Sequence, residues 1–361
     1  MRPVLVALPS KLLFVLALVL AVASFVQDQR RRSKDSKLPK SATPLWLLGG
    51  AYALVHFRAH AWLPTPDIFK RSWEDVPIHS YGVMLGISMI VGWFLAMRLA
   101  KQDGIPTETA GNIYMWTAVW SIVGARLLYG ITQYDRLSSP IDIFKIWEGG
   151  LVAYGGMIAG FLTSWYNCRK AGIPLLRWAD VSAPAVVLGT AITRVGCLLF
   201  GCDYGRVTDV AWAIRFPAGS PAFKDQLKDH VIEAGATMSA AVHPTQIYEM
   251  LAGLFLFGLL MLLRRVRRFS GQVFLGWVLG YGILRPIIEI YRDDQDRGSI
   301  FGLSTSQFIG IVSVVLGLAL MVALIKRYRQ DPASLRLWQM PLAPAAPVET
   351  HAAPAKRRRG R

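Results

Sequence analysis

Hydrophobic residues form long blocks along the chain, separated by short polar connections. Runs such as 248–263 and 308–325 contain almost no charged residue, and about 18 such residues are enough to cross a hydrocarbon core of roughly 30 Å. The alternative, a soluble protein, requires most helices to be apolar on every face. We therefore predict nine membrane-spanning helices, with ends placed to about four residues, at 4–26, 44–62, 80–100, 110–131, 150–168, 179–200, 246–263, 272–290 and 305–325.

The first two spans are the least regular of the nine. The first is similar to a signal peptide, because Arg2 precedes an apolar stretch, but the basic run Arg30–Arg32 follows it in place of a small-residue cleavage site. We predict a retained helix. The second span is interrupted by His56, Arg58 and His60. The predicted fold is an all-α polytopic membrane protein with a seven-helix core, one or two extra N-terminal helices and a small head.

The charge of the chain fits a membrane protein better than a nucleic-acid-binding protein. Charged residues make up 17% of the chain, below the roughly 25% of a soluble domain. The net charge is +17, but the basic residues lie in short runs beside apolar blocks, as in juxtamembrane loops. Basic loops alternate with loops richer in Asp and Glu, so the positive-inside rule places the N-terminus outside and the C-terminus in the cytoplasm.

The pattern divides the chain into regions. Residues 1–64 form an additional membrane segment with a basic cytoplasmic loop, and residues 65–328 form the core. Within the core, the long outer loop 202–245 carries a Gly/Pro/Ser turn cluster at 217–221, which predicts a small periplasmic head. The tail, 329–361, is basic and rich in Ala and Pro, a composition that predicts disorder.

Five charged residues mark a functional layer inside the predicted spans: Arg126, Arg194, Glu249, Arg285 and Glu289. A charge at the bilayer centre costs at least about 2.5 kcal/mol, so such residues indicate function. The topology places all five in the outer third of the membrane. Arg285 and Glu289 share a helix face, which fits either a local ion pair or an arginine directed at an anion. Three arginines against two carboxylates predict a net positive pocket, suited to a phospholipid phosphate.

Uncharged residues near the same layer leave alternatives open. Five tyrosines fit either an interfacial belt or the lining of a site: Tyr81, Tyr129, Tyr154, Tyr248 and Tyr281. The stretch EGGLVAYGGM at 148–157 fits either close helix contact or backbone exposed to a lipid headgroup. Three cysteines are too few for a disulfide framework. Cys197 and Cys202 lie five residues apart and fit packing, a disulfide or a chemical role.

Five stretches, in order, resemble the motifs of the bacterial prolipoprotein diacylglyceryl transferase family. They are IHSYGV (78–83), GARLLY (124–129), TRVGCLLFGCDYGR (193–206), HPTQIYE (243–249) and GYGILRPIIEIYR (280–292). The resemblance implies an inner-membrane enzyme with its active site toward the periplasm. It implies transfer of the diacylglyceryl group of phosphatidylglycerol to the lipobox cysteine of a preprolipoprotein, which yields a thioether and glycerol phosphate. The implied partners are phosphatidylglycerol, the lipobox segment and membrane lipids, with no cofactor, metal or nucleic acid.

The resemblance also implies roles for single residues. Arg194 would bind the lipid phosphate, Arg285 would stabilise the departing phosphate, and Tyr154 is the third candidate catalytic residue. Substrate contacts are expected from Arg194 and from Tyr81, Arg126, Gly155, Gly156, Cys197, Gly205, Glu249, Tyr281 and Glu289.

Three positions depart from the common pattern of the family. Tyr154, Cys197 and Cys202 stand where the family commonly has histidine, asparagine and glutamate, and Asp203 is a candidate replacement for the missing carboxylate. Tyrosine, with an unperturbed pKa near 10, is a poor base at neutral pH. We therefore expect the arginines to dominate catalysis, by stabilising both the thiolate and the phosphate. The alternatives are a catalytically silent relative that binds lipid, and an anion transporter, although no broken-helix repeat pair supports a transporter.

Overall fold

The computed structural model describes residues 4–8, 76–134, 139, 143–144, 150–292, 299–300, 302–335 and 337. Within these residues, the seven predicted core spans are helices, which confirms the all-α fold: α3 (Ser80–Gln102), α4 (Thr107–Thr132), α5 (Ala153–Lys170), α6 (Leu175–Phe200), α8 (Thr245–Val266), α9 (Gln272–Glu289) and α10 (Thr305–Gln330). By length and composition, α3, α6, α8 and α10 are apolar enough to cross a membrane.

The predicted N-terminal helix is wrong at its start. Residues Val4–Leu8 form strand β1, which pairs antiparallel with β2 (Val76–His79) directly before α3. A short apolar run such as VLVAL fits a strand as well as a helix, and periodicity alone does not separate the two. The rest of the 4–26 span, and the whole 44–62 span, lie outside the described residues.

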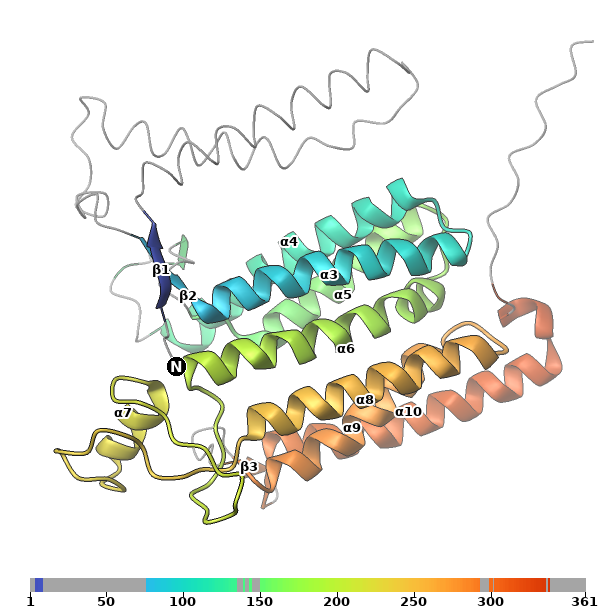
Figure 1. Cartoon of the computed structure of the whole chain (residues 1–361). Helices are drawn as coiled ribbons and strands as arrows, with labels where there is room; N and C mark the ends of the chain where they lie inside the picture. The colour runs from blue at the N-terminus through green and yellow to red at the C-terminus, as the bar shows by residue number, and fades with distance from the viewer. Residues whose placement is uncertain are drawn as a thin grey trace, which may run out of the picture.

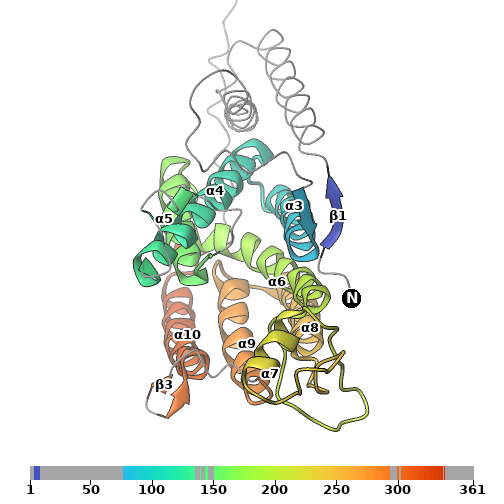
Figure 2. The same ribbon diagram turned by 90° about the vertical axis from the view of Figure 1, so that its left-hand side faces the viewer.

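Helix α6 lies at the centre of the bundle. Figures 1 and 2 show α3, α4 and α5 on one side of α6 and α8, α9 and α10 on the other. Small residues let the backbones approach closely. A side chain on Gly196 of α6, for example, would bring a Cβ atom within 3.1 Å of Tyr81 Cα on α3. The centre of the fold therefore holds α6 in contact with both halves.

The outer surface of the bundle is apolar. Large side chains such as Phe94 on α3, Phe161 on α5 and Leu316 on α10 are exposed. A contiguous apolar surface of this kind is expected where helices face lipid tails rather than water. One buried hydrophobic cluster joins α3, α4 and α6 around Leu99 and Val181, and a second joins α6, α8 and α9 around Leu256.

A buried ionic cluster joins the helix ends far from the head. We call it the basal cluster, and it comprises Asp103, Arg177, Asp180, Arg264 and Arg267. Asp103 lies 2.6 Å from Arg264 and 2.5 Å from Arg267. Asp180 is fully buried and accepts hydrogen bonds from the first backbone N–H groups of α9, at Gly271 and Phe274. The sequence analysis missed Asp180, although it lies within the predicted span 179–200.

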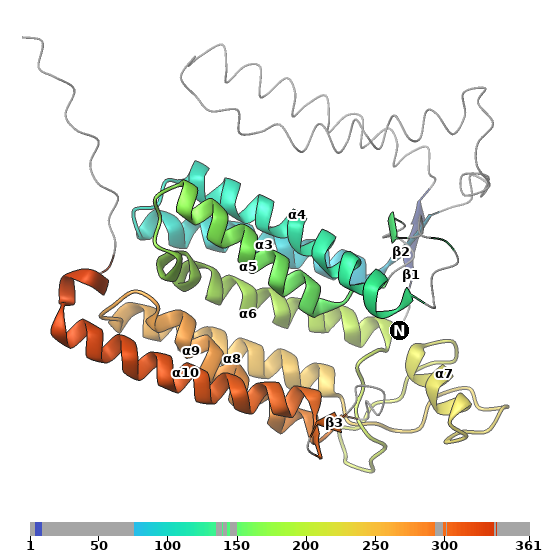
Figure 3. The same ribbon diagram turned by 180° about the vertical axis from the view of Figure 1, so that it is seen from behind.

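The head lies at the opposite end of the bundle, beyond the C-terminus of α6 (Figure 3). It contains the short helix α7 (Pro221–Lys228), which Ser220 caps by accepting a hydrogen bond from Phe223 N. Phe216, Ala222 and Val242 form its core. Isolated bridges, rather than a regular sheet, connect its extended segments.

The C-terminal part of the described chain extends past the predicted boundary at 328. Strands β3 (Ser299–Ile300) and β4 (Leu303–Ser304) precede α10, and Ser304 caps α10 in a capping box with Gln307. After α10, the short 3-10 helix η6 (Pro332–Leu335) packs Leu335 into the cluster around Phe269. The start of the predicted disordered tail is therefore folded, and the remainder lies outside the described residues, apart from 337.

Candidate functional site

Three helix ends meet beneath the head. Helices α6 and α9 run toward the head and α8 starts from it (Figure 1). Charged residues from all three helices form ion pairs there. We call the resulting ion-pair group the apical cluster, and it comprises Arg194, Asp203, Glu249, Arg285, Glu289 and Arg292. Four of these residues lie on helices, whereas Asp203 and Arg292 follow the ends of α6 and α9.

Glu249 is the centre of the apical cluster. Its Oε2 atom lies 2.5 Å from Arg194 Nε. Its Oε1 atom lies 2.8 Å from Arg292 Nη1 and also accepts a short hydrogen bond from Arg285 Nη1. Three guanidinium groups from separate segments therefore share one carboxylate. Arg194 and Arg285 meet at one depth, as the sequence predicts.

Two further carboxylates complete the cluster. Asp203 lies 2.7 Å from Arg194 and 2.6 Å from Arg292, and Glu289 lies 2.8 Å from Arg285. Burial alone would raise the pKa of Asp203, but the neighbouring guanidinium groups of Arg194 and Arg292 hold it well below its usual range. Asp203 is therefore ionised in this setting.

The apical cluster is not net positive, which corrects the sequence prediction. It contains three arginines and three carboxylates, so the formal charges sum to zero. Asp203 supplies the additional carboxylate, and Arg292 takes the place expected for Arg126. The sequence prediction counted only charged residues inside the predicted spans. Asp203 and Arg292 lie outside those spans, so the predicted excess of positive charge is not observed.

Arg126 binds the connection between α4 and α5. Its side chain is buried, donates hydrogen bonds to the carbonyl oxygens of Ile143 and Gly150, and lies over the ring of Tyr129. The position of Arg126 along α4 indicates its level in the bundle. It does not indicate the direction of the side chain, which points to the connection between α4 and α5.

The glycine pair at the start of α5 serves helix packing. A Cβ atom on Gly155 would clash with the backbone of Gly124 on α4, and one on Gly156 would lie 3.1 Å from Ser121 O. Of the two alternatives, close helix contact is therefore the one observed.

Tyr154, in the first turn of α5, is 43% exposed, and its hydroxyl makes no hydrogen bond to the described residues.

Tyr81 and Gly205 border the apical cluster. Tyr81, on the first turn of α3, lies close enough to interact electrostatically with Arg194 and Cys197. Gly205 donates a backbone hydrogen bond to His243 O and forms a bridge with Arg292. A Cβ atom on Gly205 would lie 2.5 Å from Tyr291 O. Glycine therefore allows the close approach that brings Asp203 and Arg292 together.

A narrow apolar cleft between α6, α8 and α9 reaches the apical cluster at Glu249 and Arg285. Glu249 and Arg285 form its polar lining, together with Thr190 and the exposed Tyr281. The remaining wall is apolar: Val187, Ala252, Gly253, Leu256, Trp277, Leu284 and Ile288. The cleft thus combines a hydrocarbon-like wall with an ionic group, which suits an amphipathic ligand.

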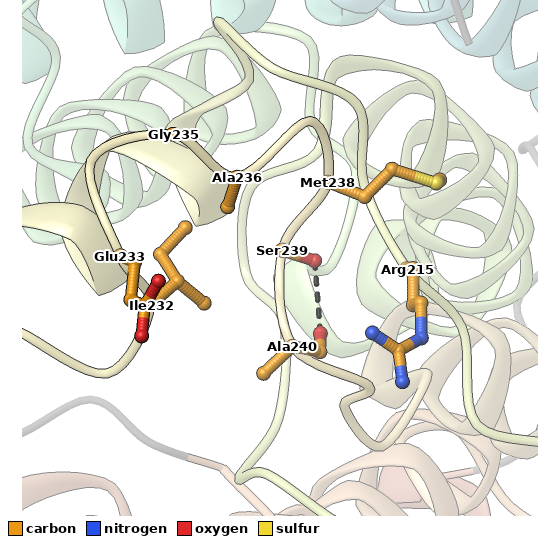
Figure 4. A pocket seen from close by; sticks show the side chains of 8 residues that line it. All are labelled: Arg215, Ile232, Glu233, Gly235, Ala236, Met238, Ser239 and Ala240. Atoms are coloured by element: carbon orange, nitrogen blue, oxygen red, sulfur yellow. Dashed lines mark hydrogen bonds between the residues drawn. The ribbon is translucent and has the colours of Figure 1, made fainter.

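A second, more open hollow lies in the head (Figure 4). Arg215, Glu233 and Met238 contribute side chains to it, and Ser239 Oγ donates a hydrogen bond to Ala240 O within its wall. It contains no residue of the apical cluster.

Sequence reasoning missed the part played by Arg292 and His243. Arg292 follows Glu289 by three residues and ends the motif at 280–292. His243 Nδ1 lies 3.1 Å from Tyr248 Oη, and the His243 ring packs against Tyr291. Tyr248 also accepts a hydrogen bond from Trp212 Nε1 at 2.7 Å. In the sequence, both residues lie within three positions of the end of a predicted helix, and this position could have identified them as site candidates.

Comparison with known proteins identifies relatives over the same region. A family model described as prolipoprotein diacylglyceryl transferase matches residues 68–323. A phosphatidylglycerol–prolipoprotein diacylglyceryl transferase of Finegoldia magna is 32% identical over 249 residues, covering 68% of this chain and 91% of the relative. The protein of the same name from Thermus thermophilus is 32% identical, covering 67% and 92%. That from Geobacter sulfurreducens is 33% identical, covering 70% and 92%.

Proposed function

The chain belongs to the prolipoprotein diacylglyceryl transferase family, and on this basis we propose that it transfers a diacylglyceryl group from phosphatidylglycerol to the lipobox cysteine of a preprolipoprotein. The products are a thioether-linked lipid and glycerol phosphate, and the reaction is the first step of lipoprotein maturation. The observation that carries the proposal for the site is the convergence of three arginines on Glu249 at the end of an apolar cleft.

The cleft and the cluster suit the two parts of a phospholipid. The apolar wall formed by residues such as Leu256 and Trp277 receives an acyl chain, and the arginines receive the phosphate. Arg194 is the most accessible of the three, with 18% of its side chain exposed against 9% for Arg285 and 1% for Arg292. Arg194 therefore binds the phosphate first, through charge-assisted hydrogen bonds.

The reaction is a substitution at the glyceryl carbon that carries the phosphate. The lipobox thiolate attacks this carbon, the carbon–oxygen bond breaks, and its electron pair remains on the phosphate oxygen. Arg285, fixed by Glu249 and Glu289, stabilises the charge that develops on the departing phosphate. A guanidinium held by two carboxylates is preorganised, so it stabilises this charge without reorganising during the reaction.

We place the protein in the bacterial inner membrane with the apical cluster toward the periplasm. Arg264 and Arg267 of the basal cluster lie in the basic run 264–268, and basic connections favour the cytoplasmic side. The head and the apical cluster then lie on the outer side, where a translocated lipobox segment arrives. The C-terminus is cytoplasmic in this arrangement.

A transfer assay tests the proposed function. The full chain in phosphatidylglycerol-containing nanodiscs is incubated with a lipobox peptide, and mass spectrometry measures the added diacylglyceryl group. The proposal requires a modified peptide whose mass gain is abolished when the peptide cysteine is replaced by serine. A folded, monodisperse protein that yields no modified peptide would instead favour the catalytically silent relative suggested by the Tyr154, Cys197 and Cys202 departures.

A further inference from the structure

The end of α6 brings two cysteines together. Gly201 adopts a left-handed conformation with φ of +83°, and the N–H groups of Gly201 and Cys202 both donate to Cys197 O, at 2.8 and 3.2 Å. This cap places Cys197, three residues before the end of α6, beside Cys202, which directly follows Gly201. The Cys-x₄-Cys spacing around Gly201 therefore makes the two thiols neighbours.

The segment after the cap is fixed by α8. Gln246 Nε2 donates to Cys202 O and Thr245 Oγ1 donates to Asp203 O, each at 2.7 Å. Both donors are buried. Cys197, Cys202 and Asp203 are thus held on a rigid frame, which is the requirement for a preorganised metal or catalytic site.

The three side chains present ligand atoms at a spacing close to that of a metal site. The two sulfur atoms and a carboxylate oxygen lie within 4.8 Å of one another. In a tetrahedral zinc site with Zn–S bonds of about 2.3 Å, ligand atoms lie about 3.8 Å apart. A contraction of about 1 Å or less would bring the three atoms to that spacing.

The surrounding charge favours such a site. Zn²⁺ with two thiolates and one carboxylate carries a formal charge of −1, and two arginines already bind the carboxylate, Arg194 at 2.7 Å and Arg292 at 2.6 Å. Arg194 Nη1 also lies 3.7 Å from Cys197 Sγ. These donors supply the outer hydrogen bonds that orient metal ligands, and thiolate ligands select zinc over magnesium or calcium.

We propose that Cys197, Cys202 and Asp203 bind Zn²⁺, and that its fourth position takes the thiol of the lipobox cysteine. This inference rests on the proposed function and deepens it. Catalytic zinc sites have three protein ligands and one open position, and a thiol bound to zinc is deprotonated. The sequence analysis expected no metal, because the spacing of the two sulfurs emerges only from the helix cap.

The reaction then proceeds without a strong side-chain base. The lipobox thiol releases its proton to water on binding zinc, and the zinc-bound sulfur attacks the glyceryl carbon. The carbon–oxygen bond to phosphate breaks, the electron pair stays on the phosphate, and the thioether leaves zinc because it is a weaker ligand than a thiolate. Arg194 contacts both Glu249 and Asp203, so it links the phosphate position to the sulfur position.

A zinc site accounts together for the three departures from the family pattern. Tyr154 replaces the common histidine, and the two cysteines replace asparagine and glutamate. Tyrosine at position 154 is a poorer base than histidine, and the two cysteines are residue types that bind zinc. A free thiol with a pKa of about 8.5 is only about 3% thiolate at pH 7. Loss of zinc should therefore slow transfer roughly 30-fold at pH 7 but only about twofold at pH 8.5.

Metal binding is tested on the full chain, purified without a metal-affinity tag and dialysed against Zn²⁺. Elemental analysis should find one zinc per chain, and Co²⁺ in its place should give thiolate-to-cobalt absorption. Cys197→Ser and Cys202→Ser should each lose both signals, whereas Cys168→Ser, at a buried cysteine far along α5, should keep them. The wild-type cobalt spectrum makes the result independent of whether a variant folds.

Several outcomes would overturn the zinc site. They are a wild-type chain without bound zinc, variants that keep the cobalt–thiolate absorption, or a Cys197–Cys202 disulfide that blocks alkylation until reduced. Transfer to the lipobox peptide separates this failure from failure of the proposed function. Unchanged transfer at pH 7 after chelation refutes the role of zinc but keeps the transferase, whereas zinc binding without transfer refutes the transferase but keeps the site.

Discussion

Arg194 on α6 and Arg285 on α9 bind the two oxygens of one carboxylate, that of Glu249 on α8. Each arginine lies on a separate helix, so their meeting depends on the packing of three helix ends. Buried ion pairs of this kind contribute little net stability, because desolvation offsets the attraction. Their value lies in geometry, since they fix two guanidinium groups beside an apolar cleft.

Glu249→Gln should destabilise the protein. The change leaves three guanidinium groups with two carboxylates, and removal of one partner from a buried pair costs about 3–5 kcal/mol. Thermal unfolding in detergent measures the effect. Glu233→Gln, in the open hollow of the head, is the matched control and should unfold like the wild type. An unchanged unfolding temperature for Glu249→Gln would show that Glu249 does not organise the cluster.

Filling the cleft should weaken lipid binding. Ala252→Phe inserts a ring into the apolar cleft, where it competes with the acyl chain, and a loss of about 1–3 kcal/mol in binding corresponds to a KM for phosphatidylglycerol raised about 5- to 150-fold. Ala319→Phe places the same ring on the exposed surface of α10 and should leave KM unchanged. Equal KM values for the two variants would exclude the cleft as the acyl site.

Tyr154→Phe should have a small effect on transfer. The Tyr154 hydroxyl makes no hydrogen bond to the described residues, so its removal breaks no contact among them. We expect kcat within about twofold of the wild type at pH 7. A loss of about 100-fold or more would mark Tyr154 as a general acid or base and would contradict the view that arginines and a metal-bound thiolate suffice.

The basal cluster should be structural. Asp103→Asn leaves Arg177, Arg264 and Arg267 with one carboxylate, Asp180, and should lower stability by about 3–5 kcal/mol. KM for phosphatidylglycerol should not change, because this cluster lies at the other end of α6, roughly 25 Å from Arg194 by the rise per residue. Thermal unfolding and steady-state kinetics on the same sample separate the two effects. A changed KM with normal stability would contradict this assignment.

The sequence predicts the helices well because their apolar blocks are long. It also predicts the meeting of Arg194 and Arg285, since both lie at the same depth. Depth does not reveal direction, however, so Arg126 was expected in the cluster but binds Gly150 instead. Arg292 follows α9 and reaches the apical cluster because the backbone at Gly205 lies close to the backbone of Tyr291 and Arg292. Only the fold shows this contact.

Local turns account for the other differences. The contact between Cys197 and Cys202 depends on the left-handed Gly201 and on hydrogen bonds from α8, which a spacing of five residues does not specify. The Asp180 cap likewise joins residues about 90 positions apart. Apolar periodicity carries no information about such polar contacts between distant segments.

Arginine replacement at the apical cluster tests the central claim most directly. Transfer of a diacylglyceryl group to a lipobox peptide is measured for Arg194→Gln and Arg285→Gln, with Arg215→Gln in the head as the matched control. Loss of one preorganised charge donor should lower kcat about 100- to 1,000-fold in either cluster variant, and the control should match the wild type. Wild-type transfer by either cluster variant would contradict the account.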